Sequence, residues 1–355
     1  MPIFDQGYQH WTGKLSSHTW RWLPITRQGV RSGLKNRYLR IVLLLAWLPA
    51  LLLAVMLCVW GLVERNSDLV SSLLGFLKNL FGPQTVTDPK HYRVEVWTIY
   101  FHYFLQAELR FSLLVLLLVG PNLISADLRF NALPMYFSRP LRRFDYFLGK
   151  LGVVATFIGL IVIVPSVIAY VLGLLFSLDL SIIGDTYPLL LAAIGYGVVI
   201  ALSAGLLVLA LSALSRNSRY VGLFWVAILI VSGIVSSVLE TVDQQQRMRM
   251  NRSREQTASP DEFAAQQAEA WKTDWRPALS YTANLSRIGE QFLGTNACWE
   301  SIYQFMPPMK RTEFLYKNVM SPQFPWYWSA GILIALFGLS ACILNFRVKS
   351  LDRLK

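Results

Sequence analysis

Seven charged residues lie in one stretch of the sequence, where they could form ion pairs with a soluble partner. Gly120 to Lys150 reads GPNLISADLRFNALPMYFSRPLRRFDYFLGK and lies between two strongly apolar runs. Pro121 and Pro134 are expected to interrupt a continuous helix there, because proline lacks an amide donor and its ring crowds the preceding turn. Its charged residues are Asp127, Arg129, Arg139, Arg142, Arg143, Asp145 and Lys150. Such a segment is either an ordinary basic loop at the inner membrane surface or a point where a soluble protein docks.

The second half of this stretch predicts a turn followed by a short helix. Ser138-Arg139-Pro140 is typical of a turn, since the residue before a proline is pushed out of the helical region. A short amphipathic helix is expected to begin at Leu141. Its apolar side would hold Leu141, Phe144, Phe147 and Leu148, and its exposed side Arg142, Arg143 and Asp145.

Motifs that carry catalysis are absent from the sequence. There is no G-x-x-x-x-G-K-[ST] loop to cradle a phosphate, and Gly149-Lys150 lacks both the earlier glycine and the following hydroxyl residue. The four histidines are scattered, and none has metal-ligand spacing. Ser203 superficially resembles an intramembrane nucleophile, but no histidine in its apolar run could activate it. We therefore expect a chain that is not itself an enzyme and that holds no cofactor or metal.

The composition is that of an integral membrane protein. Of the 355 residues, 54% are hydrophobic and only 15% are charged, whereas a soluble protein carries about 25% charged residues. Uncharged runs of about 20 residues are long enough to cross a bilayer as helices. The fold class expected is an all-α polytopic membrane protein with six transmembrane helices. The spans are predicted at 41–63, through 111–126 with an upstream extension, 151–178, 187–215, 220–239 and 326–346.

Two ionisable residues stand close to the second span. Glu108 and Arg110 are expected near its outer interface, where they either extend to water or line a translocation path. The interiors of the predicted spans otherwise contain no Asp, Glu, Lys or Arg. This argues against a self-powered, proton-coupled carrier, so a transporter of this design would need an external motor.

The charge distribution predicts the topology. With both termini inside, the inner segments 1–40, 126–150, 214–220 and 347–355 hold 18 of the 33 lysines and arginines but only 4 of the 21 acidic residues. The positive-inside rule predicts such an excess of lysine and arginine on the cytoplasmic side. The net charge of +12 is therefore a topology signal, and nucleic acid is not expected as a partner.

Two regions outside the spans are expected to be helical. Residues 20–40 predict a basic, aromatic helix lying on the inner leaflet, with a flexible basic tail as the alternative. Residues 241–325 form a polar insert, predicted as a helical extracytoplasmic cap; a disordered linker is the alternative. Its helices are expected from Ser259, around 284–292 and around 298–305, with Gly294 closing the second. The resulting regions are 1–40, 41–240, 241–325 and 326–355.

Several runs in the central stretch resemble one family. They are Leu123-Ile124-Ser125-Ala126-Asp127-Leu128-Arg129, Ala132-Leu133-Pro134, Ser138-Arg139-Pro140-Leu141, Asp145-Tyr146 and Gly149-Lys150. Together they are similar to the first cytoplasmic loop of ABC-2-type ABC transporter permeases, and the opening MPIFDQGY also resembles some of these permeases. The long insert before the last span departs from the usual pattern.

The resemblance implies a function and its partners. The loop would be a coupling helix that docks on a separate ABC ATPase, which alone would bind ATP and Mg²⁺. A second permease subunit, identical or not, would complete the transporter. The residues implied in coupling are Asp127, Arg129, Ser138, Arg139, Pro140, Leu141, Arg142, Arg143, Asp145, Tyr146 and Lys150.

The expectation is an exporter subunit in a bacterial cytoplasmic membrane, with both termini in the cytoplasm. Within the loop, Arg139, Arg142 and Arg143 are expected to contact the ATPase, and Asp127 and Arg129 to brace its base. The alternative is a membrane assembly or sensory protein that does not transport and acts through its external 241–325 region.

Overall fold

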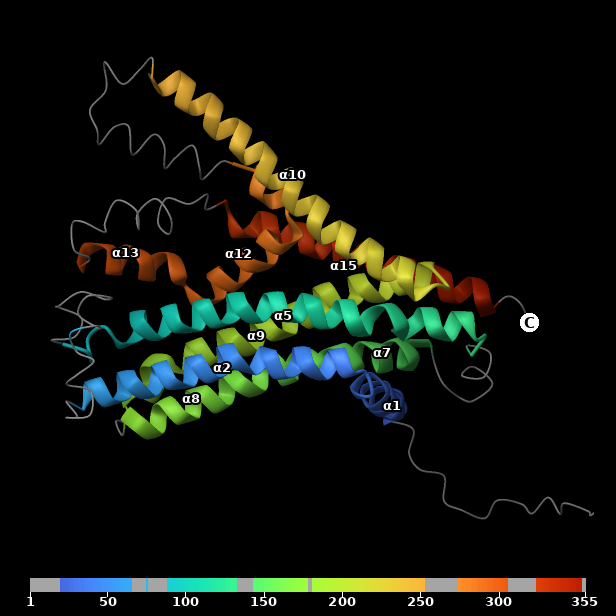
Figure 1. Cartoon of the computed structure of the whole chain (residues 1–355), viewed down its shortest axis with the longest axis horizontal. Helices are drawn as coiled ribbons and strands as arrows, with labels where there is room; N and C mark the ends of the chain where they lie inside the picture. Colours follow the sequence, from blue (N-terminus) through green and yellow to red (C-terminus); the bar gives the residue numbers. More distant parts are fainter. Residues whose placement is uncertain are drawn as a thin grey trace, which may run out of the picture.

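The chain folds into a bundle of long helices. The computed structural model describes residues 20–65, 75, 88–132, 143–177, 181–252, 274–305 and 324–352. Within these ranges no strand occurs, and six helical segments are long and apolar enough to cross a membrane. The protein is therefore an all-α, multi-pass membrane protein, as the sequence predicts (Figure 1).

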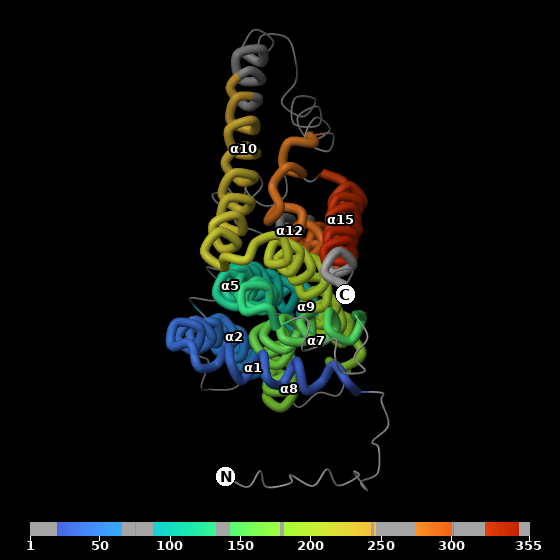
Figure 2. The backbone as a smooth tube through the Cα atoms, turned by 90° about the vertical axis from the view of Figure 1, so that its right-hand side faces the viewer, coloured from blue at the N-terminus to red at the C-terminus, as the bar shows by residue number. Residues whose placement is uncertain are grey.

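The first two helices meet at a capped break. Helix α1 (Leu23–Leu34) is followed by α2 (Arg37–Glu64), the first spanning helix. Asn36 has an extended backbone, and its side chain accepts a hydrogen bond from the Tyr38 amide, which is the N-cap that starts α2. The break lets α1 lie across the bundle while α2 runs along it (Figure 2).

The bundle is built around α9. The second span is α5 (Arg93–Arg129), the fourth is α9 (Ser181–Leu214), and α9 packs on α5, on α15 (Trp326–Asp352) and on α7 (Arg143–Ile158). In its most apolar window 67% of α9 is buried, the largest share among the six spans. Its many small residues allow such close approach from several sides.

Helix α5 continues through Pro121, where the sequence predicted an interruption. The proline removes one amide donor and opens the turn, and Ser212 of α9 fills the opening. The Ser212 hydroxyl donates to the Pro121 carbonyl at 3.0 Å and accepts from the amides of Ile124 and Ser125 at 3.0 and 2.9 Å. Ser212 thus joins α9 to the turn of α5 that follows the proline. Because α5 is continuous from Arg93 to Arg129, the expectation of a helix break at Pro121 is wrong, and Pro134 lies outside the described residues.

The third span begins earlier than expected. Helix α7 starts at Arg143 and continues through a π-helical turn, η3 (Gly159–Ile163), into α8 (Val164–Ser177). The predicted division at 150, with a short amphipathic helix before the span, is therefore wrong for the described residues. Arg143–Ser177 is one helical segment, and the residues from Arg143 onward form its first turns.

The insert contributes helices to the bundle itself. After α10 (Ser218–Arg252) come η4 (Arg276–Leu279), α12 (Tyr281–Leu293) and α13 (Thr295–Phe305). Two of the predicted helices are confirmed, and Gly294, with φ of +65°, ends α12. The predicted helix from Ser259 lies outside the described residues.

The position of α12 differs from that of an external cap. Tyr281 at its start contacts the hydroxyl of Ser203 at 3.0 Å, and Ser203 lies well inside α9. Helix α12 also packs on α5, α10 and α15. By contrast, α10 leaves the bundle at an angle, and only 17% of its apolar window is buried (Figure 1).

Candidate functional site

The base of the central loop begins where α5 ends. Phe130 and Ala132 donate backbone hydrogen bonds to the carbonyls of Ala126 and Asp127, and between them Asn131 has a positive φ of 50°. Asparagine tolerates this left-handed conformation better than most residues, so it can end the helix as glycine often does. The last turn of α5 thereby holds Asp127 at the end of the bundle where α7 begins.

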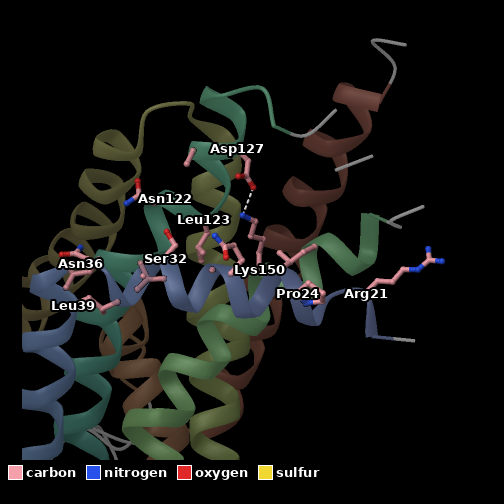
Figure 3. A pocket seen from close by; sticks show the side chains of 16 residues that line it. Arg21, Pro24, Ser32, Asn36, Leu39, Asn122, Leu123, Asp127 and Lys150 are labelled. Atoms are coloured by element: carbon pink, nitrogen blue, oxygen red, sulfur yellow. Dashed lines mark ion pairs between the residues drawn. The ribbon is translucent and has the colours of Figure 1, made fainter. Parts of the chain in front are cut away.

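Asp127 joins the two helices on either side of the loop. Its Oδ2 lies 2.6 Å from Nζ of Lys150 and accepts a hydrogen bond from the Tyr146 hydroxyl at 2.8 Å. Tyr146 and Lys150 are four residues apart on α7, so both point from the same face toward the carboxylate. The Lys150 and Asp127 side chains are only 11% and 15% exposed, so water screens this ion pair weakly (Figure 3).

Helix α1 packs closely on the same part of α7. The Thr26 hydroxyl donates to the Gly149 carbonyl at 2.9 Å. A Cβ atom on Gly149 would stand 2.8 Å from Cβ of Ile25, and one on Gly29 would overlap Cγ2 of Val153. Glycine is therefore needed at both positions for the two helices to touch. Movement of α7 at the loop would carry α1 with it.

The structure brings together some of the predicted coupling residues and separates others. Asp127, Tyr146 and Lys150 form the cluster above, and the last two are buried. Arg129 is exposed, and its guanidinium lies 5.6 Å from the Phe130 ring centre. The partly exposed residues at the start of α7 are Arg143 and Asp145. Ser138, Arg139, Pro140, Leu141 and Arg142 lie outside the described residues.

The two ionisable residues that the sequence predicts near the outer interface, Glu108 and Arg110, lie at the middle of helix α5. Arg110 is 17 residues from Arg93 and 19 from Arg129, so it is about 25 Å from the nearer helix end. Glu108 is fully buried, and its carboxylate oxygens have no hydrogen-bond partner in the described part of the chain. Arg110 is exposed on the outside of α5.

A third charged cluster, at the opposite end of the bundle, was missed at the sequence level. Arg93 makes a two-pronged contact with Glu64, with both distances 2.9 Å, and its Nη1 reaches Asp185 at 3.3 Å. Arg93 and Glu64 are each 2% exposed. The Ser177 hydroxyl also donates to Glu64 at 2.9 Å. This cluster fixes the ends of α2, α5, α8 and α9 that lie farthest from Asp127 against one another.

Comparison with known proteins gives no relative from which to transfer a function: no protein-family model and no curated protein matches the chain. In the described ranges, no three His, Cys, Asp or Glu side chains come together as a metal ion would require. The charged side chains described above lie in three places: Asp127 with Lys150 between α5 and α7, Glu108 and Arg110 at the middle of α5, and Arg93 with Glu64 and Asp185 at the opposite end of the bundle.

Proposed function

We propose that this chain is the transmembrane subunit of an ABC-2-type transporter, an exporter driven by a separate ATPase. The observation that carries the proposal is the exposed arginine at the middle of α5. Stretches without Asp, Glu, Lys or Arg flank the Glu108–Arg110 pair on both sides, Val96–Ala107 and Phe111–Ala126. Placing an arginine against lipid tails is costly, and such residues usually face a second subunit or a water-filled path.

The inner loop supports the coupling part of the proposal. Asp127 and Lys150 tie its two ends together, and close packing ties α7 to α1. A push on the loop would therefore reach α1, α5 and α7 at once. The sequence has no phosphate-binding loop of its own, so ATP and Mg²⁺ belong to the partner ATPase.

The arrangement in the membrane follows from the same proposal. Two permease subunits pair in a bacterial cytoplasmic membrane, both termini lie in the cytoplasm, and α1 rests on the inner leaflet. Leu23 and Leu34, exposed on one side of α1, suit the lipid, and the exposed Arg27 and Arg31 suit its headgroups.

The test is affinity purification of the tagged protein from its native host in mild detergent. We expect a stoichiometric soluble ATPase, whose activity is uncoupled from transport when Arg142 and Arg143 are both replaced by Glu. The matched control replaces Arg216 and Arg219, two exposed arginines of another predicted inner turn, by Glu. This control changes the charge of the inner surface by the same amount and should leave ATP hydrolysis coupled to transport. Purification without any ATPase would contradict the proposal and favour the non-transporting alternative.

A further inference from the structure

A cleft of about 700 Å³ lies between α1, the inner half of α5 and the beginnings of α2 and α7. Figure 3 shows α1 along one side of it, with Asn36 and Leu39 toward one end, Arg21 at the other and the Asp127–Lys150 ion pair between them. This volume falls within the range of pockets that enclose drug-sized molecules, about 300–1,000 Å³. The cleft is therefore large enough to hold a small organic ligand.

The walls of the cleft are fixed by contacts already described. Helix α1 is held on α7 through Thr26 and Gly149, and α5 is held on α7 through Asp127 and Lys150. Neither set of contacts draws α1 onto the inner half of α5. The cleft is thus a preformed feature of how these helices meet, which lowers the cost of binding because no wall must be rearranged.

The lining combines an apolar floor with neutral polar groups. Leu39, Val119 and Leu123 supply buried apolar surface. Gln28, Ser32 and Asn122 supply amide and hydroxyl groups. Of the charged residues, Lys150 and Asp127 neutralise each other, and the guanidinium of Arg21 points away from the other labelled side chains (Figure 3). The cleft thus offers hydrogen bonds without an unbalanced charge in its interior.

The cleft opens on a different side of α1 from the one that suits lipid. Gln28 and Ser32, four residues apart, share the face of α1 that lines it. The exposed apolar residues Leu23 and Leu34 lie on another face. A ligand in the cleft would therefore be separated from the bulk lipid by α1.

We propose that this cleft binds a neutral amphiphile, a molecule with an apolar body and an uncharged head bearing hydroxyl or amide groups. The apolar part lies on Leu39, Val119 and Leu123, and the head hydrogen-bonds the side-chain amides of Gln28 and Asn122. Binding is independent of the transport function proposed above. The cleft is occupied in the isolated protein whether or not an ATPase is present.

The experiment measures protection of an engineered cysteine in phosphatidylcholine nanodiscs. Ser32→Cys places a thiol in the cleft, and Arg31→Cys places one on the adjacent exposed face of the same helix. A water-soluble maleimide labels each protein, and peptide mass spectrometry gives the rate at each site. The probes are monodecanoylglycerol, decanoate and decyltrimethylammonium, which share a ten-carbon chain and differ in head charge.

Monodecanoylglycerol should slow labelling at Ser32→Cys and leave Arg31→Cys unchanged. At a free concentration of about four times Kd the unoccupied fraction, and with it the labelling rate, falls about fivefold. The charged probes should protect weakly. Adding Asn122→Ala, which removes an exposed amide of the lining, should restore labelling toward the unprotected rate.

Three results would overturn the proposal. Equal protection at both positions means that the probe merely partitions into the bilayer. Stronger protection by decanoate or decyltrimethylammonium means that the site selects a charged head. Protection that appears when the ATPase is present, without any added probe, means that the cleft is part of a protein interface. None of these outcomes depends on transport, so the cleft and the proposed function fail separately.

Discussion

At the scale of single residues, Asp127 has the largest structural role at the inner end of the bundle. It accepts from Tyr146 and pairs with Lys150, and so holds the ends of α5 and α7 together across the loop. Removing one partner of a largely buried ion pair is costly, because the other charge stays behind without compensation.

Asp127→Ala should therefore lower the free energy of unfolding by about 2 kcal/mol, since Lys150 and Tyr146 both lose their partner. Lys150→Met in the same protein should recover part of that loss by removing the unpaired cation. Thermal denaturation of the wild type, both single variants and the double variant gives the coupling energy. An Asp127→Ala protein with the same melting temperature as the wild type would show that the ion pair contributes nothing to stability.

The sequence singled out Asp127 and Lys150 but could not pair them. Their meeting depends on where α5 ends and where α7 begins. The sequence predicted an interruption of α5 at Pro121 and a division of the following helical segment at 150, and the structure has neither. The outer cluster of Arg93, Glu64 and Asp185 had no local signal at all. Charges at helix ends are common at membrane interfaces, and only the packing of four helices brings these three together.

At the scale of elements, apolar length predicted the six spans correctly and local rules misplaced some of their ends. The expectation at Pro121 was wrong because the rule treats a helix in isolation, whereas Ser212 of α9 hydrogen-bonds the turn of α5 that follows the proline. The small-residue content of α9 was visible in the sequence. The entry of α12 into the bundle was not, since its polar surroundings are typical of an external segment.

The contact between α1 and α7 can be tested by enlarging one glycine. Gly29→Val would overlap Val153 and should push α1 off α7. If the overlap weakens the docking of α1 on α7 by about 1.4 kcal/mol, the population of protein with α1 detached rises about tenfold. The rate of trypsin cleavage at Arg27 and Arg31 should rise by the same factor.

Gly331→Val is the matched control, because a Cβ atom there meets nothing within 4 Å. It changes a glycine to the same residue in a spanning helix and should leave the cleavage rate at Arg27 and Arg31 unchanged. Equal rates in wild type and Gly29→Val would mean that α1 is held by something other than α7.

At the scale of the whole molecule, burial is unevenly distributed over the six spans. The apolar windows of α10 and α15 are 17% and 22% buried, against 67% for α9. These sparsely packed helices present long apolar surfaces to lipid or to another subunit. The α5 face that carries Arg110 differs from them, because a charge interrupts it at mid-length.

Arg110→Cys should react with a water-soluble cationic methanethiosulfonate in membranes, because a charged residue at mid-span requires nearby water. The control is Leu51→Cys, which is 63% exposed and lies at the middle of α2. We expect reaction at position 110 to be at least about tenfold faster, since lipid tails exclude the charged reagent from position 51. Equal rates would place Arg110 against lipid and remove the main support for a polar path.

The length of α5 has a mechanical consequence. At 37 residues the helix is about 55 Å long, so a tilt of about 10° about its middle moves each end by roughly 5 Å in opposite directions. One end carries Asp127, the other end is bound through Arg93 to Glu64, and Arg110 lies near the middle, where such a tilt displaces the helix least. If α5 tilts as a rigid rod about its middle, a displacement of its Asp127 end in one direction would displace its Arg93 end in the opposite direction. Arg110 would then move little.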